Sequence, residues 1–178
     1  MVDSTAGSNR MVTGLFRDRD SAERAYQTLS DRGYSQDDVN LVMSDETRKK
    51  HFTDIDGVET ELGSKAAQGA GVGGAIGGTL GAIAAAVAAI GTSVVFPGLG
   101  LVVAGPLAAA LAGGGAGAAT GGLLGALIGW GIPEERVKEY ESGINDGGIL
   151  MGVNSRSDED AMLFENNWKE NNGVNVYR

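Results

Sequence analysis

Few side chains in this sequence have the types needed for acid–base, nucleophilic or metal chemistry. The 178 residues include no Cys, which excludes thiolate nucleophiles and Cys-ligated zinc, and a single His, which nearly excludes Ser-His-Asp chemistry and sites with two His ligands. The one His, His51, follows Lys49 and Lys50 and has no evident partner nucleophile, so we interpret it as a surface residue. We therefore predict no catalytic residue and a protein that is not an enzyme.

A run of carboxylates offers the only candidate metal site, because Ca²⁺ and Mg²⁺ prefer oxygen ligands. Its members are Asp54, Asp56, Glu59 and Glu61. Gly57 stands at the fourth position of this loop, whereas an EF-hand loop needs glycine at the sixth. We interpret the run as a solvated acidic linker and predict no bound metal.

Glycines at Gly69, Gly71 and Gly74 match the G-x-G-x-x-G spacing of dinucleotide-binding loops. No strand is expected before them and no acidic residue follows at the required distance, so helix packing explains them better. Nucleic-acid binding is also disfavoured, because the net charge is -9 and the strand aromatics are limited to Phe16 and Tyr177. We predict no cofactor and no nucleic-acid partner.

The glycines belong to a long segment without charge. Residues 66–132 contain no Asp, Glu, Lys, Arg or His, and 20 Gly plus 19 Ala fill most of its 67 positions. Nine of these glycines recur every fourth residue, in two runs that would each form a ridge on one helical face: Gly69, Gly73, Gly77 and Gly81, then Gly113, Gly117, Gly121, Gly125 and Gly129. Such ridges let a second backbone approach closely, so we predict helix packing and homo-oligomerisation there.

Breaks near Pro97 and Pro106 divide this segment into two expected helices, residues 66–95 and 107–131, which would form a glycine-zipper hairpin. Both are long enough to cross a bilayer, and the flanking Lys and Arg residues favour a polar domain on the cytoplasmic side of a cell membrane. Gly and Ala add little hydrophobicity, so the hairpin could instead be the dry interior of an oligomer in the cytoplasm. A low-complexity insert without fixed structure is a third interpretation.

The polar flanks predict two strand-helix-strand units. The first has strands near 11–17 and 39–43 around a helix that Asp18, Asp20 or Ser21 would cap and Gly33 would end. The second follows a helix that starts at Pro133, with strands near 148–153 and 174–177 around a helix capped by Ser157. Tyr26, Phe164 and Trp168 are the expected core aromatics.

This order predicts an α+β fold, a ferredoxin-like split β-α-β domain interrupted by the all-α glycine-zipper hairpin. A rival is an open α/β sheet with the Pro133 helix in a third layer. We expect a disordered N-terminus at 1–10, the two halves of the ferredoxin-like domain at 11–63 and 133–178, and the hairpin at 64–132.

Residues 12–46, VTGLFRDRDSAERAYQTLSDRGYSQDDVNLVMSDE, resemble the opening module of the bacterial heat-induced and general stress protein family. The matching positions are Val12, Gly14, Phe16, Asp18, Ala22, Ala25, Leu29, Gly33, Tyr34, Asp38, Val39 and Val42. Asn40 departs from the usual Ser or Thr, at a strand position that we expect to face solvent. The resemblance implies a role in the stress response and no catalytic residues.

Three functions follow from these patterns. The first is a non-enzymatic stress-response protein that a membrane hairpin anchors and assembles, with itself and the lipid bilayer as partners. The second is a scaffold outside the membrane that forms a large homo-oligomeric particle through the same glycine ridges. The third is a regulatory domain that binds a small ligand on its sheet.

Overall fold

The computed structural model describes residues 10–52, 94–96, 100–108, 125 and 127–178. Within them the chain runs β1 (Met11–Phe16), α1 (Arg19–Asp31), a 3₁₀ turn η1 (Gln36–Asp38), β2 (Val39–Ser44), α2 (Asp45–Phe52), β3 (Val94–Phe96) and β4 (Leu101–Ala104). It continues through α7 (Glu134–Asn145), β5 (Ile149–Asn154), α8 (Asp158–Glu170) and β6 (Val174–Tyr177). Both strand-helix-strand units of the sequence analysis are present.

Side chains cap the two long helices at the predicted residues. The Asp18 carboxylate accepts the Ser21 N–H at 2.8 Å at the start of α1, and the Ser157 hydroxyl accepts the Asp160 N–H at 3.1 Å at the start of α8. Each cap satisfies a backbone donor that the first helical turn would otherwise leave without a partner. Gly33 ends α1 with a φ of 75°, a value that glycine adopts without steric cost.

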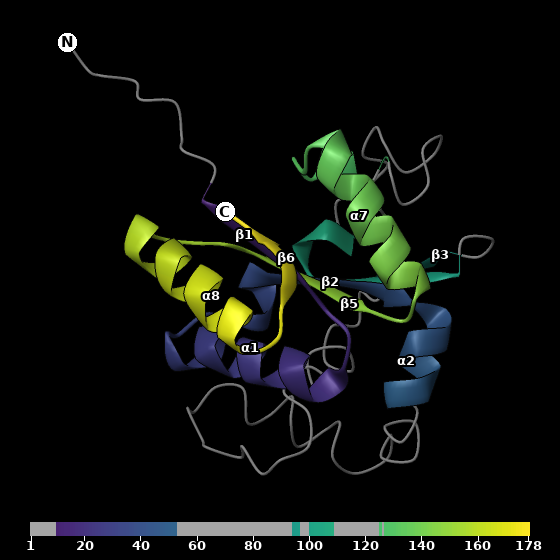
Figure 1. Cartoon of the computed structure of the whole chain (residues 1–178), viewed down its shortest axis with the longest axis horizontal. Helices are drawn as coiled ribbons and strands as arrows, with labels where there is room; N and C mark the ends of the chain where they lie inside the picture. The colour runs from purple at the N-terminus through teal and green to yellow at the C-terminus, as the bar shows by residue number, and fades with distance from the viewer. Residues whose placement is uncertain (1–9, 53–93, 97–99, 109–124, 126) are drawn as a thin grey trace.

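The strands form one antiparallel sheet in the order β3-β4-β2-β5-β1-β6. Strand β5 lies between β1 and β2, and β1 lies between β5 and β6, so the two strand-helix-strand units interleave. Both crossover helices, α1 and α8, lie side by side on one face of the sheet, while α7 lies on the opposite face (Figure 1). The fold class is therefore α+β, as predicted.

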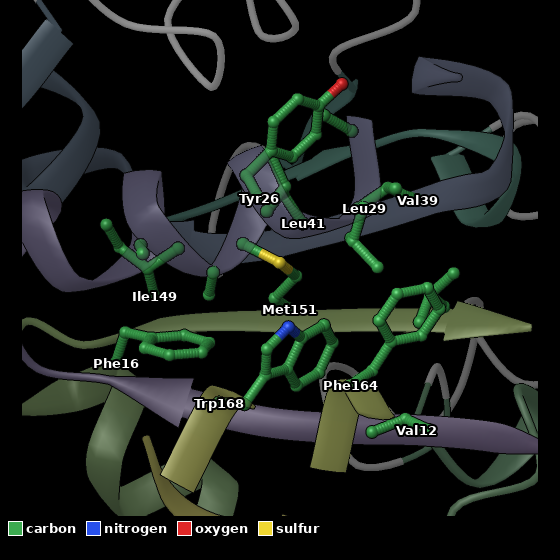
Figure 2. Packing of buried hydrophobic residues seen from close by; sticks show 14 of the residues in the cluster. Val12, Phe16, Tyr26, Leu29, Val39, Leu41, Ile149, Met151, Phe164 and Trp168 are labelled. Carbon is green, nitrogen blue, oxygen red and sulfur yellow. The ribbon is translucent and has the colours of Figure 1, made fainter. Parts of the chain in front are cut away.

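The sheet carries a core on each face. The first core lies under α1 and α8, and its buried side chains include Phe16, Tyr26, Leu41, Met151, Phe164 and Trp168 (Figure 2). The second lies under α7, and its buried side chains include Leu15, Val42, Leu127, Tyr140, Ile144 and Leu150. Because both faces are covered, every residue of β1 and the first five of β5 are buried, without the polar alternation of a sheet that faces water.

The expectation of an all-α insert is wrong for the described residues between 64 and 132. Residues Val94–Phe96 and Leu101–Ala104 form a hairpin of strands, and β4 extends the sheet by pairing with β2 from Leu41 to Ser44. Glycines at both ends of β4, Gly100 and Gly105, have φ values of 61° and 99° that suit the turns there. The rival fold correctly placed the Pro133 helix in a third layer. It expected an open α/β sheet, whereas the neighbouring strands of the observed sheet are antiparallel.

The prediction of membrane-spanning helices is also corrected. Among the residues that the structure describes, no helix has the length and apolar character needed to cross a bilayer. The range expected for the first helix, 66–95, overlaps the observed strand β3, which begins at Val94. The range expected for the second helix, 107–131, ends at an observed turn formed by Trp130 and Gly131. The remaining residues of these two expected helices lie mostly outside the described part of the chain.

Candidate interaction surface

The last residues of the second glycine ridge are described, and they lie against the second core. Gly125 and residues 127–129 are helical, and we call them the ridge end. Leu127 is fully buried, whereas Ile128 is 47% exposed and Gly129 is exposed. A Cβ atom placed on Gly129 would meet no atom within 4 Å, so its space is not filled by the described chain. The outward side of the ridge end is thus small and apolar.

Seven of the nine predicted ridge glycines lie outside the described residues. Gly69, Gly73, Gly77, Gly81, Gly113, Gly117 and Gly121 lie outside the described residues, and so does the acidic run from Asp54 to Glu61. The first ridge, and the contact between the two ridges, therefore stay predictions. Gly125 is half-buried, so the two described ridge glycines differ in exposure.

Trp130 fixes the chain after the ridge end to the centre of the sheet. Its indole lies so close to Gly152 of β5 that no side chain could stand at that position. Gly152 pairs with Asn40 of β2 on one side and with Thr13 of β1 on the other. The second face of the sheet therefore holds a row of three small or polar residues beneath an aromatic ring.

Asn40 joins this row to the residues after β4. Its side-chain oxygen accepts the Leu107 N–H at 2.6 Å, and Asn40 is only 2% exposed. The expectation that Asn40 faces solvent is wrong, because its face of the sheet carries the second core. A buried amide oxygen that binds a backbone N–H at a helix start holds the chain after Gly105 in register with β2.

Tyr140 of α7 occupies the other end of the row. Its hydroxyl donates to the Asn175 carbonyl at 2.7 Å and lies 2.8 Å from the Thr13 hydroxyl. Burial holds the pKa of Tyr140 above its ordinary value, so the ring stays neutral. Asn175 has a φ of 51° where the pairing of β1 with β6 shifts, so Tyr140 secures a bulged edge strand.

A second polar cluster joins the two strand-helix-strand units on the other side of the molecule. The Tyr34 hydroxyl donates to Asp160 at 2.9 Å and accepts the Arg156 N–H at 2.7 Å. Arg156 also stacks 4.2 Å above the Tyr34 ring and bonds Asp38 at 2.9 Å. Burial alone would raise the pKa of Asp38, but hydrogen bonds from Ser35 and the Arg156 charge outweigh it and leave that pKa below its ordinary value.

The remaining chemical candidates serve packing or lie at the surface. His51 is half-buried on α2, and its backbone carbonyl accepts a hydrogen bond of 2.7 Å from Arg19. Burial, and then Lys50, lower the pKa of His51. Phe164 and Trp168 are fully buried and Tyr26 is 5% exposed, which confirms them as core aromatics. In the described parts of the chain, no three acidic or His side chains gather in a way that could hold a metal ion.

Sequence reasoning missed the residues that build the second core, although one signal was available. Leu41, Val42 and Met43 are consecutive apolar residues, and successive side chains of a strand point to opposite faces of the sheet. Strand β2 therefore offers apolar side chains to both faces. A strand with that pattern is buried on both sides, which would have placed Asn40 inside. The Gly152 position also has a meaning, since glycine inside a strand often marks a close approach of another group.

Comparisons of this chain with protein-family models, with curated proteins and with solved structures find no match. The resemblance of residues 12–46 to the stress protein family therefore stays a prediction. The ridge end combines an exposed large apolar side chain, Ile128, with a glycine whose space the described residues leave unfilled.

Proposed function

We propose that this protein is a non-enzymatic protein of the bacterial stress response that assembles with copies of itself through its glycine ridges. The observation that carries the proposal is the direction in which the ridge end faces. Leu127 is directed into the second core, whereas Ile128 and Gly129 are exposed. A helix surface with an exposed Ile beside an unfilled glycine can accept the backbone of a second helix at short range.

The same arrangement explains why assembly would not disturb the sheet. Leu127, Trp130 and Ile132 attach the chain on both sides of Gly129 to the second core, so the exposed residues are presented from a fixed base. A rigid base reduces the entropy lost when two copies bind. A small closed oligomer and the large homo-oligomeric particle of the sequence analysis could both be built on this contact, and they would differ in the number of copies.

The ferredoxin-like assignment is part of this proposal. It is supported by the strand order β2-β5-β1-β6 and by α1 and α8 together on one face. Two interleaved β-α-β units with this pairing are the arrangement that defines such domains. The hairpin β3-β4 and the helix α7 would then be additions to it. The stress-response role is supported by the resemblance of residues 12–46.

Size-exclusion chromatography with light scattering tests the proposal with the variant Gly129→Leu. The described residues of one chain leave this position open, so the new side chain should leave their fold intact while filling the space that a second helix would use. We expect the Gly129→Leu variant to have a lower molar mass by light scattering than the wild-type assembly. The matched control is Ser142→Leu, which places the same Leu side chain at an exposed helical position on α7.

Circular dichroism is the control that checks whether both variants are folded. A wild-type protein that stays monomeric at high micromolar concentration would contradict the proposal, and so would a Gly129→Leu variant with the mass of the wild type. The distribution of mass in the wild type separates a small closed oligomer from a large particle. The double variant Gly117→Leu, Gly121→Leu extends the test along the same ridge.

A further inference from the structure

The turn between α8 and β6 contains an Asn–Gly pair whose chemistry the fold controls. Asn172 is exposed and has a φ of 60°, a left-handed conformation that Asn tolerates better than most residues. The following residue has to be glycine, because a Cβ at Gly173 would lie 2.6 Å from the Trp168 carbonyl oxygen. The tight end of α8 therefore requires Gly173 and favours a residue such as Asn or Gly before it.

An Asn followed by Gly can lose its side-chain amide without any enzyme, because no side chain shields the next backbone nitrogen. The Gly173 nitrogen attacks Cγ of Asn172, the N–Cγ bond forms, and the Cγ–Nδ2 bond breaks. Nδ2 leaves as ammonia with the proton that Gly173 gives up. Water then opens the cyclic imide at either carbonyl and yields aspartate or isoaspartate, so water is the only co-reactant.

In the folded chain the attacking nitrogen is already engaged. The Gly173 N–H donates to the Trp168 carbonyl at 2.7 Å, and this hydrogen bond must break before the nitrogen can lose its proton. Trp168 is fully buried in the first core, so its carbonyl has little freedom to follow Gly173 outward. The reaction consequently requires the turn to open.

We propose that Asn172 is a deamidation site that local opening of the α8–β6 turn controls. Chains whose turn has opened acquire a permanent change at Asn172, and closed chains do not. Isoaspartate adds a methylene to the backbone, which misplaces Gly173 relative to Trp168. Strand β6 begins one residue later and packs Val176 near Gly14 and Gly173, so the modified turn weakens the docking of this edge strand.

The full-length chain tests the proposal by incubation in buffer and in concentrated urea. Peptide mapping in ¹⁸O-labelled water then measures aspartate and isoaspartate at position 172. Hydrogen exchange of the Gly173 amide reports opening at the same N–H. We expect folding to slow deamidation and hydrogen exchange by the same factor, because both need the same opening. Asn172→Gly, which keeps the left-handed turn and lacks the amide, sets the baseline.

Tyr140→Phe supplies the perturbation, since it removes the hydrogen bond that holds Asn175 of β6. Loss of one such bond should raise both rates about two- to tenfold in the folded chain. Deamidation as fast in buffer as in urea would overturn the proposal, and so would a folded Tyr140→Phe chain whose hydrogen exchange rises while its deamidation does not. If this variant fails to fold, the comparison of the two rates in the wild type still decides between these outcomes.

Discussion

Replacing Gly152 by Ala tests whether the chain after the ridge end is fixed to the sheet. The new methyl group would occupy the space of the Trp130 ring, whose Cζ2 and Cζ3 atoms lie 2.7 and 3.0 Å from the ideal Cβ position. Trp130 is half-buried, so its indole can yield by swinging outward. The alternative is that β5 and its neighbours shift to make room.

Both responses have a similar cost. Overpacking a core position destabilises a protein by about 1 to 3 kcal/mol. Freeing the ring would expose on the order of 100 Å² of apolar surface, which is worth about 2.5 kcal/mol. Ala also lowers the conformational entropy of the unfolded chain, which stabilises the folded state by about 0.4 to 1 kcal/mol. We expect a net loss of about 1 to 2 kcal/mol in the free energy of unfolding, or about 2 to 8 °C in Tm.

Urea unfolding and acrylamide quenching of tryptophan fluorescence measure the two effects. The chain has two Trp residues, and Trp168 is fully buried, so the accessible part of the emission reports on Trp130. This part should increase in Gly152→Ala. Gly129→Ala is the control, because its Cβ would meet no atom of the described residues and Ala is the better helix former by about 0.8 to 1 kcal/mol. Unchanged quenching and stability in Gly152→Ala would refute the contact.

Two further predictions concern single polar groups. Asn40→Ala should lower the free energy of unfolding by about 1 to 3 kcal/mol, because the buried Leu107 N–H loses its acceptor. Urea unfolding measures this change. An Asn40→Ala chain as stable as the wild type would show that the hydrogen bond contributes nothing to stability. Burial raises the pKa of Tyr26 to about 12 from the usual 10, so the folded state favours the neutral ring. The stability from this group is fully present below pH 10 and is lost as the pH rises from about 10 to about 12, in all about 2 to 3 kcal/mol. Tyr26→Phe should therefore weaken the alkaline loss of stability, and an unchanged pH profile would contradict the role of this ring.

The elements that could be predicted are those whose signals are local. Asp18 and Ser157 cap helices through bonds to residues three positions later, and Gly33 ends a helix through its own backbone angle. Each signal depends on a few neighbouring residues and on no distant partner. The two strand-helix-strand units followed from such signals.

Helix α2 was missed although its signals are also local. Ser44 accepts the Thr47 N–H at 3.0 Å, and Asp45 pairs with Arg48 at 3.2 Å and with Lys49 at 2.6 Å. Acidic residues in its first turn and basic residues in its last turn favour a helix. The segment lacks an apolar stripe, since only Thr47 and Phe52 are buried, and so a search for periodicity overlooks it.

The hairpin β3-β4 could not be found by local reasoning, because its conformation depends on β2. Leu101–Ala104 is a short apolar run of the kind that suits a buried helix as well as a buried strand. Only the free edge of β2, which pairs with β4 from Leu41 to Ser44, decides between them. The steps of three and four residues between large apolar side chains, which continue as far as Val94, led to a helix instead.

The distribution of charge also gave a misleading boundary. A stretch of 67 residues without charge suggests an object separate from the polar domain. Yet its described parts complete that domain, because β4 extends the sheet and Leu127, Trp130 and Ile132 cover the second face. A sheet buried on both sides needs apolar side chains to cover each face, and in the described charged segments α7 is the helix that covers this face. Absence of charge thus marks a part of this domain's interior together with the surface that we propose for assembly.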